Sequence, residues 1–426
     1  MSQQAIDPLV SLRRDLHQRP EPAWCEFYTT SRIVDEIERI GVDELYVGRD
    51  ALDPDARRRV PDDDTLTEWR ERARDAGARD DVLDATDGGN TGAIAVYEAG
   101  DGPTIALRTD IDALPRAEAD DDDHYPAAEG FRSEHEGYMH ACGHDAHATI
   151  GIGVLEAIVE SDFEGTFKVL FQPAEEAGAG GAPMTEAGHV DDVDYFLAVH
   201  VGMDHPTGEI VGGIGGFLAT GGLKMTFHGE PAHAGGKPNA GRNAFQAMAT
   251  AIQNLYGIAR HGDGGTRVNV GVVEGGTATN IIPEEAYLEG EVRGETSELR
   301  NYMLERAETV IENAARMHDC EVELETTTGL PGSQSDDELA TIVAEVGDEL
   351  DDVESILEHD DLGGSEDATV LMNRVQELGG LASYVGVGTD HPGGHHTGTF
   401  DVDEASLDIG IELLTESILR IQEREP

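Results

Sequence analysis

The sequence MHACGHDAH, Met139 to His147, is the stretch around which this chain is organised, and it places one thiol, three imidazoles and a carboxylate within nine residues. The apolar residues that follow predict a helix to about Val159, so Cys142 and His144 stand in the loop before it. A thiolate and imidazoles suit Zn²⁺, and with carboxylates they also suit Mn²⁺ or Co²⁺. Alone, the pair is equally typical of a buried cysteine beside a helix-capping histidine.

Polar side chains follow three predicted strands, at the point where each strand ends. Asp110 and Asp112 follow the strand at 104–107, Glu175 and Glu176 follow the strand at 167–171, and His200 ends the strand at 195–199. Strands that alternate with helices predict an α/β fold with a mostly parallel sheet, whose sites form at the carboxyl ends of strands. We therefore expect these side chains to lie beside Cys142 and His144.

Two adjacent glutamates cannot easily share one role. One is suited to bind a metal, while the other takes a proton from water and returns it to a leaving amine; a solvated acidic turn is the plainer alternative. Asp112 is expected to orient a ligand histidine rather than bind metal itself. The loop Asp390-His391-Pro392-Gly393-Gly394-His395-His396 is expected to supply one further ligand.

The order of predicted elements indicates a second domain inserted into the first. Residues 1–212 and 328–426 are predicted to form the mostly parallel catalytic domain, and residues 213–327 read as βαββαβ, the ferredoxin-like α+β order. The glycine-rich stretch 212–222 between them is expected to act as a hinge. Residues 48–91 interrupt the first domain as an insertion anchored by Trp69, for which a surface excursion without chemistry is the plainest interpretation.

Composition excludes several classes of partner. The formal net charge is −58 and the excess of acidic residues extends along the whole chain. Neither nucleic acid nor an anionic membrane is expected to bind, and the charge suggests a high-salt cytoplasm, where salt screens self-repulsion. Three distant cysteines predict no disulfide framework, and no signal or membrane-spanning segment is expected. We predict a soluble, cytoplasmic protein.

Together these motifs resemble the amidohydrolase branch of the M20 metallo-aminoacylase/carboxypeptidase family. The resemblance covers nearly the whole chain and rests on the following stretches: 110–115, 139–145, 172–176, His200, 232–234, 280–283, 290–293, 365–367 and 400–404. Most members of the branch lack the insertion at 48–91. The resemblance implies a hydrolase that cleaves the amide bond of N-acyl or N-aroyl amino acids, among them acidic ones.

The same resemblance implies a role for each matching residue. One or two divalent ions per subunit, Mn²⁺ before Zn²⁺ or Co²⁺, would be held by Cys142, His144, Glu176, His200 and His396. Glu175 would be the general base and acid. His233 and Asn280, on the inserted lid domain, would reach a partner subunit's active site, to steady the oxyanion and hold substrate. Arg293 would grip the substrate's carboxylate, and the lid domain would form a homodimer or a heterodimer with a related subunit.

Two alternatives stay open. Cys142 would serve as the nucleophile of a metal-free amidase if a histidine base lay within hydrogen-bond reach. The chain would otherwise be a non-catalytic or co-catalytic subunit of a hetero-oligomeric amidohydrolase, although its full set of candidate ligands argues against this.

Overall fold

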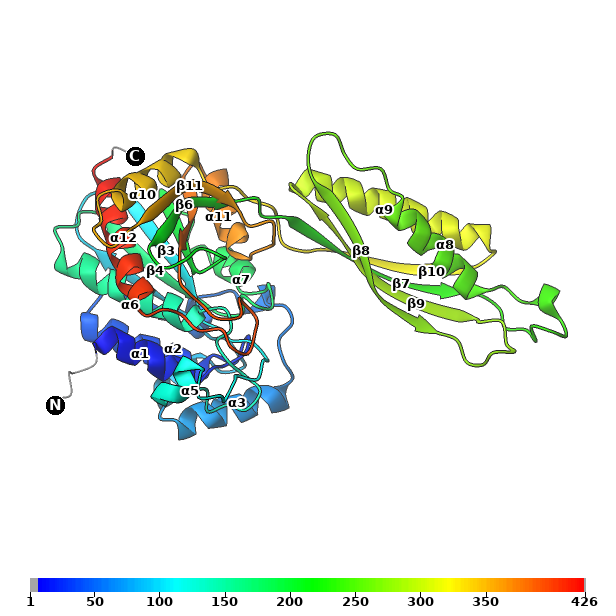
Figure 1. Ribbon diagram of the computed structural model, residues 1–426, viewed down its shortest axis with the longest axis horizontal. Coiled ribbons are helices and arrows are strands. Elements are labelled where there is room, and N and C mark those ends of the chain that lie inside the picture. Colours follow the sequence, from blue (N-terminus) through cyan, green and yellow to red (C-terminus); the bar gives the residue numbers. More distant parts are fainter. Residues whose placement is uncertain (1–6, 425–426) are drawn as a thin grey trace. The chain divides into compact units, whose positions relative to one another are not determined.

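The structure, a computed structural model, describes residues 7–424, which fall into two compact units (Figure 1). The first unit comprises residues up to Gly215, then Gln334–Leu362 and the chain from Glu366 onward. The second comprises Gly216–Ser333 with Gly363–Ser365. Each is described by itself below.

The first unit is built on one eight-stranded sheet. Its strands run in the order β1 (Glu44–Val47), β2 (Ala93–Glu98), β4 (Thr166–Gln172), β3 (Thr104–Asp110), β5 (Tyr195–Val201), β12 (Leu381–Val387), β6 (Glu209–Gly215) and β11 (Ser355–Asp361). The central run β4–β3–β5–β12 is parallel, as is the β6–β11 pair, while β1–β2, β2–β4 and β12–β6 are antiparallel. The predicted α/β class is confirmed, with a mixed sheet whose parallel centre carries the candidate residues.

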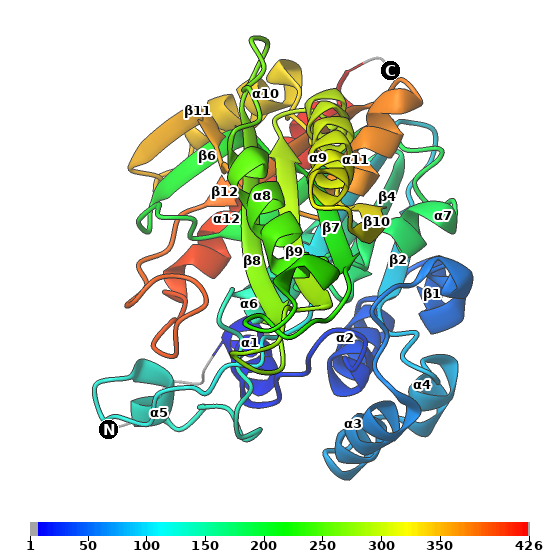
Figure 2. The ribbon, with the colours of Figure 1, turned by 90° about the vertical axis from the view of Figure 1, so that its right-hand side faces the viewer.

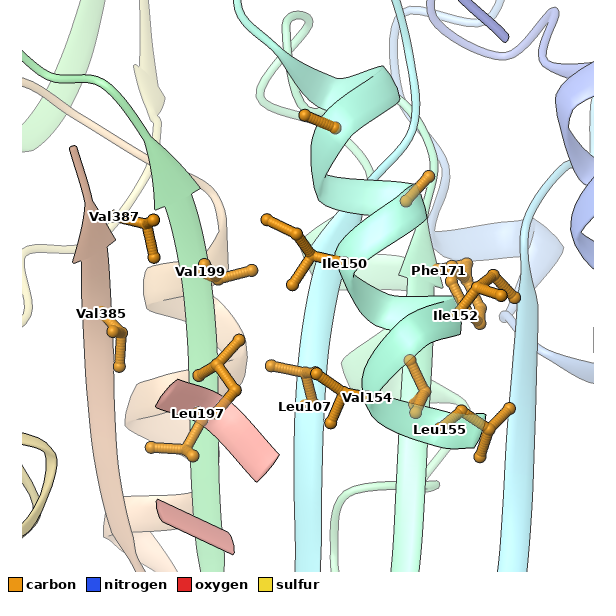
Figure 3. Packing of buried hydrophobic residues seen from close by; sticks show 14 of the residues in the cluster. Leu107, Ile150, Ile152, Val154, Leu155, Phe171, Leu197, Val199, Val385 and Val387 are labelled. Carbon is orange, nitrogen blue, oxygen red and sulfur yellow. The ribbon is translucent and has the colours of Figure 1, made fainter. Parts of the chain in front are cut away.

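Helix α6 (His144–Glu160) forms the centre of the core. Its sequence is apolar on every side, which is typical of a helix enclosed by neighbours. Ile150, Ile152, Val154 and Leu155 pack beside Leu107, Leu197, Val199 and Val385 of the parallel strands (Figure 3). Close against α6 lie α1 (Pro8–Gln18), α2 (Phe27–Ile40) and α12 (Ala405–Gln422), and α12 also contacts α10 (Asp337–Gly347). Two further helices, α7 (Gly181–Glu186) and α11 (Ala368–Glu377), pack on each other, and α11 contacts β5 and β12.

The insertion at 48–91 is ordered and packed. It contains two short 3-10 turns (Gly48–Asp50 and Pro54–Ala56) and the helices α3 (Asp63–Asp75) and α4 (Asp80–Ala85), which lie against α2. Asp62 caps α3 by accepting a hydrogen bond from the backbone of Thr65. Trp69 is 3% exposed and packs edge-on against Tyr138, with ring centroids 4.9 Å apart. The anchoring role predicted for Trp69 is consistent with this packing.

The second unit has a four-stranded antiparallel sheet in the order β10 (Glu321–Thr328), β7 (Ala219–His228), β9 (Glu285–Gly294) and β8 (Thr266–Gly275). Helices α8 (Ala244–Tyr256) and α9 (Ser297–Met317) cover one face of it (Figure 2). The chain order with this strand order is the ferredoxin-like arrangement that the sequence predicted. Among the described residues, no helix is long and apolar enough to cross a lipid bilayer.

Candidate metal centre

Gly143 determines how the Cys142–His144 pair is presented. It caps the start of α6 with a φ of 87°, in the left-handed region that favours glycine. A Cβ atom at this position would stand 2.5 Å from Cγ2 of Val201, a buried residue of β5. The glycine therefore allows the motif to lie directly against the end of β5, next to His200.

His200 is held as a neutral imidazole whose Nε2 lone pair faces the thiol of Cys142. Its Nδ1 donates to the backbone oxygen of Val201 at 2.7 Å, which fixes the tautomer. Burial lowers the pKa of His200 well below its usual value. Nε2 then lies 3.5 Å from Sγ of Cys142 with its lone pair unprotonated, the form in which histidine binds metal.

Two buried polar atoms face the same place without a hydrogen-bond partner among the described residues. Nε2 of His144 and Oε1 of Glu176 make no hydrogen bond and lie 3.9 Å apart. Nε2 of His396 lies 3.7 Å from that same Glu176 oxygen. Leaving such atoms unsatisfied is costly, so their convergence is explained best by a bound cation.

The donor atoms gather into overlapping groups in which every atom lies within 4.8 Å of the others. Three of these groups are Cys142, His144 and His200; Cys142, Glu176 and His396; and His144, Glu175 and Glu176. Two more contain Asp110, one with His144 and His147 and one with Glu175 and Glu366. Sulfur, imidazole nitrogen and carboxylate oxygen together form a set that fits Zn²⁺, Mn²⁺ or Co²⁺. All five predicted ligands are thus neighbours.

His395, the neighbour of the predicted ligand in the same histidine loop, also reaches this site. Its Nδ1 lies 3.7 Å from Sγ of Cys142, while its Nε2 accepts a hydrogen bond from the backbone of Met203 at 2.9 Å. The backbone φ of His396 is 62°, an unusual value for a residue other than glycine. In this conformation its ring lies toward Glu176. Both histidines border the cluster, and His396 is the one beside the unpartnered carboxylate.

Asp112 connects the two halves of the site. One oxygen of its carboxylate lies 3.2 Å from Nδ1 of His144 and accepts from the backbone of Glu175 at 3.1 Å, and the other accepts from the backbone of Glu176 at 3.0 Å. The prediction that Asp112 orients a ligand histidine agrees with this geometry. Glu26, buried beneath the turn, accepts from the backbone of Ala174 at 2.8 Å.

Glu175 stands among other carboxylates. Burial, together with the charges of Glu366 and Asp367, raises its pKa well above the usual value for glutamate. A carboxyl whose proton affinity is raised in this way is suited to collect a proton and hold it during a reaction. Burial also raises the pKa of Glu176, to about 7.

Arg108 is a buried hub that sequence reasoning missed. Its guanidinium donates to Gln172 at 2.9 Å, to Asp110 at 2.8 Å and to Glu366 and Asp367 at about 3 Å. An arginine in the middle of the apolar stretch Thr104–Asp110 was the signal present in the sequence, because a buried charge requires partners. The positive charge of Arg108 offsets the mutual repulsion of these carboxylates.

His147 lies beside the cluster with both ring nitrogens occupied. Nδ1 donates to Asp110 at 2.5 Å and Nε2 accepts from the backbone of Val201 at 2.8 Å. No lone pair of the His147 ring therefore remains for a cation.

His233, Asn280 and Arg293 belong to the second unit. The ring Nδ1 of exposed His233 accepts from the backbones of Gly235 and Gly236, so Nε2 carries the hydrogen. The backbone oxygen of Asn280 accepts from Ala234 at 2.9 Å, which places these two loops side by side. Arg293 is held by Glu291 at 2.9 Å and borders a hollow of about 290 Å³ with Arg267 and Asn269.

Comparison with known proteins identifies the family of this chain. The sequence model of peptidase family M20/M25/M40 matches residues 106–420. Indole-3-acetyl-aspartic acid hydrolase of Enterobacter agglomerans is 43% identical over 96% of this chain and 95% of its own length. One of the subunits of p-aminobenzoyl-glutamate hydrolase from Escherichia coli K12 is 40% identical over 96% of this chain and 94% of its own.

Solved structures give the same result. An aminobenzoyl-glutamate utilization protein from Klebsiella pneumoniae superposes with a TM-score of 0.77 at 36% identity, over 98% of this chain and 97% of its own. A dinuclear metal binding peptidase of the M20 family from Bacillus subtilis superposes with a TM-score of 0.73 at 26% identity, over 97% of this chain and 98% of its own. The family resemblance predicted from the sequence is confirmed. The chain belongs to peptidase family M20/M25/M40 and is a hydrolase of amide bonds.

Proposed function

We propose that the chain hydrolyses the amide bond of N-acyl or N-aroyl amino acids with a water activated by divalent metal. The observation that carries this proposal is the meeting of unpartnered His144 Nε2 and Glu176 Oε1 with Cys142, His200 and His396. These five side chains would hold one or two ions, Mn²⁺ in the first place and Zn²⁺ or Co²⁺ as alternatives. A divalent ion at such a site lowers the pKa of water and polarises a carbonyl group.

The protein's own residues supply the remaining chemistry. Glu175 takes the proton of the attacking water and delivers it to the leaving nitrogen, for which its raised pKa is suitable. Asp112 and Glu26 hold the turn that carries Glu175 through backbone hydrogen bonds. The His233 ring, with its hydrogen on Nε2, would donate to the oxyanion, and Asn280 and Arg293 would hold the substrate.

The substrate class follows from two relatives. Their names contain indole-3-acetyl-aspartic acid and p-aminobenzoyl-glutamate, which both join an aromatic acyl group to an acidic amino acid. We infer that this chain also releases aspartate or glutamate from an N-acyl or N-aroyl conjugate.

Assembly and location complete the proposal. The lid domain would pair two subunits, alike or related, so that His233 and Asn280 serve the partner's active site. Support comes from β8, an edge strand of its sheet on which Val272 and Val273 are 40% and 53% exposed. Such an edge is suited to a partner chain. Light scattering at several protein concentrations tests this. We place the protein in a high-salt cytosol because of its charge.

The test of the function is a substrate panel in high salt with Mn²⁺. It contains p-aminobenzoyl-glutamate, indoleacetyl-aspartate and simple N-acetyl amino acids, with Glu175→Gln as the variant. We expect the parent to cleave at least one conjugate, and Glu175→Gln to lose at least about 100-fold in kcat with metal content unchanged. Equal rates for the two proteins would contradict the role of Glu175.

The Cys142 nucleophile remains the second candidate because Cys142 Sγ lies 3.5 Å from His200 Nε2. Burial raises the pKa of that thiol to about 12, which does not favour a thiolate. Chelation followed by Mn²⁺ readdition separates the two mechanisms, because only the metal-dependent one is lost and then restored. Activity of the purified chain alone would exclude the alternative that it is a non-catalytic subunit.

A further inference from the structure

The insertion at 48–91 does more than cover the surface, because it is bonded along the segment that follows the two glutamates. His189 donates to the backbone oxygen of Asp50 at 2.7 Å, and the backbone of Asp53 donates to Pro183 at 2.9 Å. Nη1 of Arg59 donates to the backbone oxygen of Ala177 at 2.6 Å. Ala177 comes directly after Glu176, so Arg59 is attached to the turn that carries the proposed catalytic groups.

The loop that carries Arg59 is held in place by contacts with the buried residue Trp24. Nε1 of Trp24, a fully buried residue, donates to the backbone oxygen of Arg58 at 2.8 Å. The guanidinium of Arg57 lies 5.5 Å over the Trp24 ring and also donates to Gly88. Arg59 itself has a φ of 56°, a value that a non-glycine residue keeps only when its surroundings enforce it. The position of Arg59 is therefore set by the fold.

The guanidinium of Arg59 forms no ion pair with any of the described residues. The chain has 87 acidic and 29 basic residues, and most arginines of this unit sit beside a carboxylate. Arg57, Arg58 and Arg59 form no ion pair there, and Arg59 is exposed. Its bond to Ala177 uses one of five N–H donors, so a planar edge remains that fits a carboxylate with two hydrogen bonds.

We propose that Arg59 binds the side-chain carboxylate of an aspartyl or glutamyl substrate and thereby selects acidic amino acids. This rests on the proposed function and adds a residue to it. With the scissile amide beside Glu175, the second carboxylate of the leaving amino acid is only a few bonds away. The site would otherwise repel it, because Glu175, Glu176, Glu366 and Asp367 all lie in that region. The insertion supplies the compensating charge.

The experiment compares N-aroyl-glutamate with N-aroyl-glutamine. The two have nearly the same shape and the same α-carboxylate, but the glutamine conjugate lacks the charge of the side-chain carboxylate. Both are assayed in the metal-loaded full chain at constant KCl, for the parent, Arg59→Gln and the control Arg74→Gln. Arg74 lies in the same insertion and pairs with exposed Asp80, so the control removes the same charge away from the turn. Arg59→Gln is expected to lower kcat/KM for the glutamate conjugate by about 10- to 100-fold and to leave the glutamine conjugate within about twofold.

Several outcomes would overturn the inference. A glutamate-to-glutamine preference that is unchanged in Arg59→Gln, or equal losses on both conjugates, would make Arg59 a purely structural support of the turn. A fall of the same size in Arg74→Gln would show only a long-range charge effect. If the parent cleaves neither conjugate, the proposed function fails, and Arg59 is then judged by calorimetry: glutamate must bind the parent more tightly than Arg59→Gln, and equal affinities reject its role.

Discussion

Nδ1 of His144 lies 3.2 Å from a carboxylate oxygen of Asp112, and the same carboxylate accepts the backbone N–H groups of Glu175 and Glu176. One side chain thus orients an imidazole and fixes the turn of two glutamates. Hydrogen bonds to Asp112 therefore fix the positions of a predicted metal ligand and of the turn that carries the two glutamates.

Asp112→Asn is expected to weaken metal binding by about 10- to 100-fold, because an amide offers one acceptor oxygen where three donors now meet. Titration of metal-free protein with Mn²⁺, followed by equilibrium dialysis, measures this. Asp120→Asn, in an exposed loop, is the control and should bind like the parent. Unchanged affinity in Asp112→Asn would show that the turn keeps its shape without this carboxylate.

Gly143→Ala is expected to disturb the site more than an equivalent change elsewhere. Its new Cβ would meet Val201 at 2.5 Å in addition to the cost of a left-handed alanine. Gly137→Ala is the matched control, because Gly137 has a φ of 84° and nothing within 4 Å. The control should lose about 1–2 kcal/mol of unfolding free energy.

Gly143→Ala should lose more stability than this control and also bind Mn²⁺ more weakly. Denaturant titration and metal titration of both proteins check the prediction. The same loss in both would mean that the space beside Val201 is not limiting.

Stability is expected to depend on pH through His17. Burial lowers the pKa of His17, but hydrogen bonds to Asp145 at 2.8 Å and Glu118 at 3.0 Å outweigh it and raise the pKa to about 9. A folded-state pKa above the unfolded value of about 6.5 means that protonation stabilises the fold. This contribution is fully present below a pH of about 6.5 and is lost as the pH rises through about 9.

His17→Gln should therefore remove up to about 3 kcal/mol of the fall in unfolding free energy between about pH 6 and about pH 9.5. Urea titrations at both pH values in constant KCl give the unfolding free energy at each pH, and from these the slope of unfolding free energy against pH. If the slope of His17→Gln equals that of the parent, this histidine does not titrate in that range.

Trp69→Ala is expected to cost about 3–5 kcal/mol, because a buried aromatic ring leaves a cavity. Since Trp69 is the largest of the three buried residues of α3, the loss should appear first as faster amide hydrogen exchange across 48–91. Leu378→Ala, which removes a side chain that is 49% exposed, serves as the control. Uniform exchange changes over the whole first unit would contradict a separately opening insertion.

The local chemistry of the site could be read from the sequence, whereas several long-range features could not. Asp112, Glu175, Glu176 and His200 each lie at the end of a strand in a parallel run, and the strand-end rule placed them together. The contacts of Arg108 with Glu366 and Asp367 span more than 250 residues, and no periodicity signals them.

Gly212 lies in the stretch 212–222 that was expected to act as a hinge. The stretch enters β6 and β7, and a Cβ at Gly212 would lie 2.3 Å from the backbone oxygen of Ala340. The glycine at that position serves close packing of α10 rather than flexibility. The exposed edge strand β11 was missed because its acidic residues lack the apolar alternation of a half-buried strand.

The Glu175–Glu176 turn is held by backbone hydrogen bonds to Asp112 and Glu26 rather than by the side chains of its own two glutamates. A substitution of either glutamate therefore leaves these backbone bonds in place. A change of activity in such a variant then reports the lost carboxylate and not a rearranged loop.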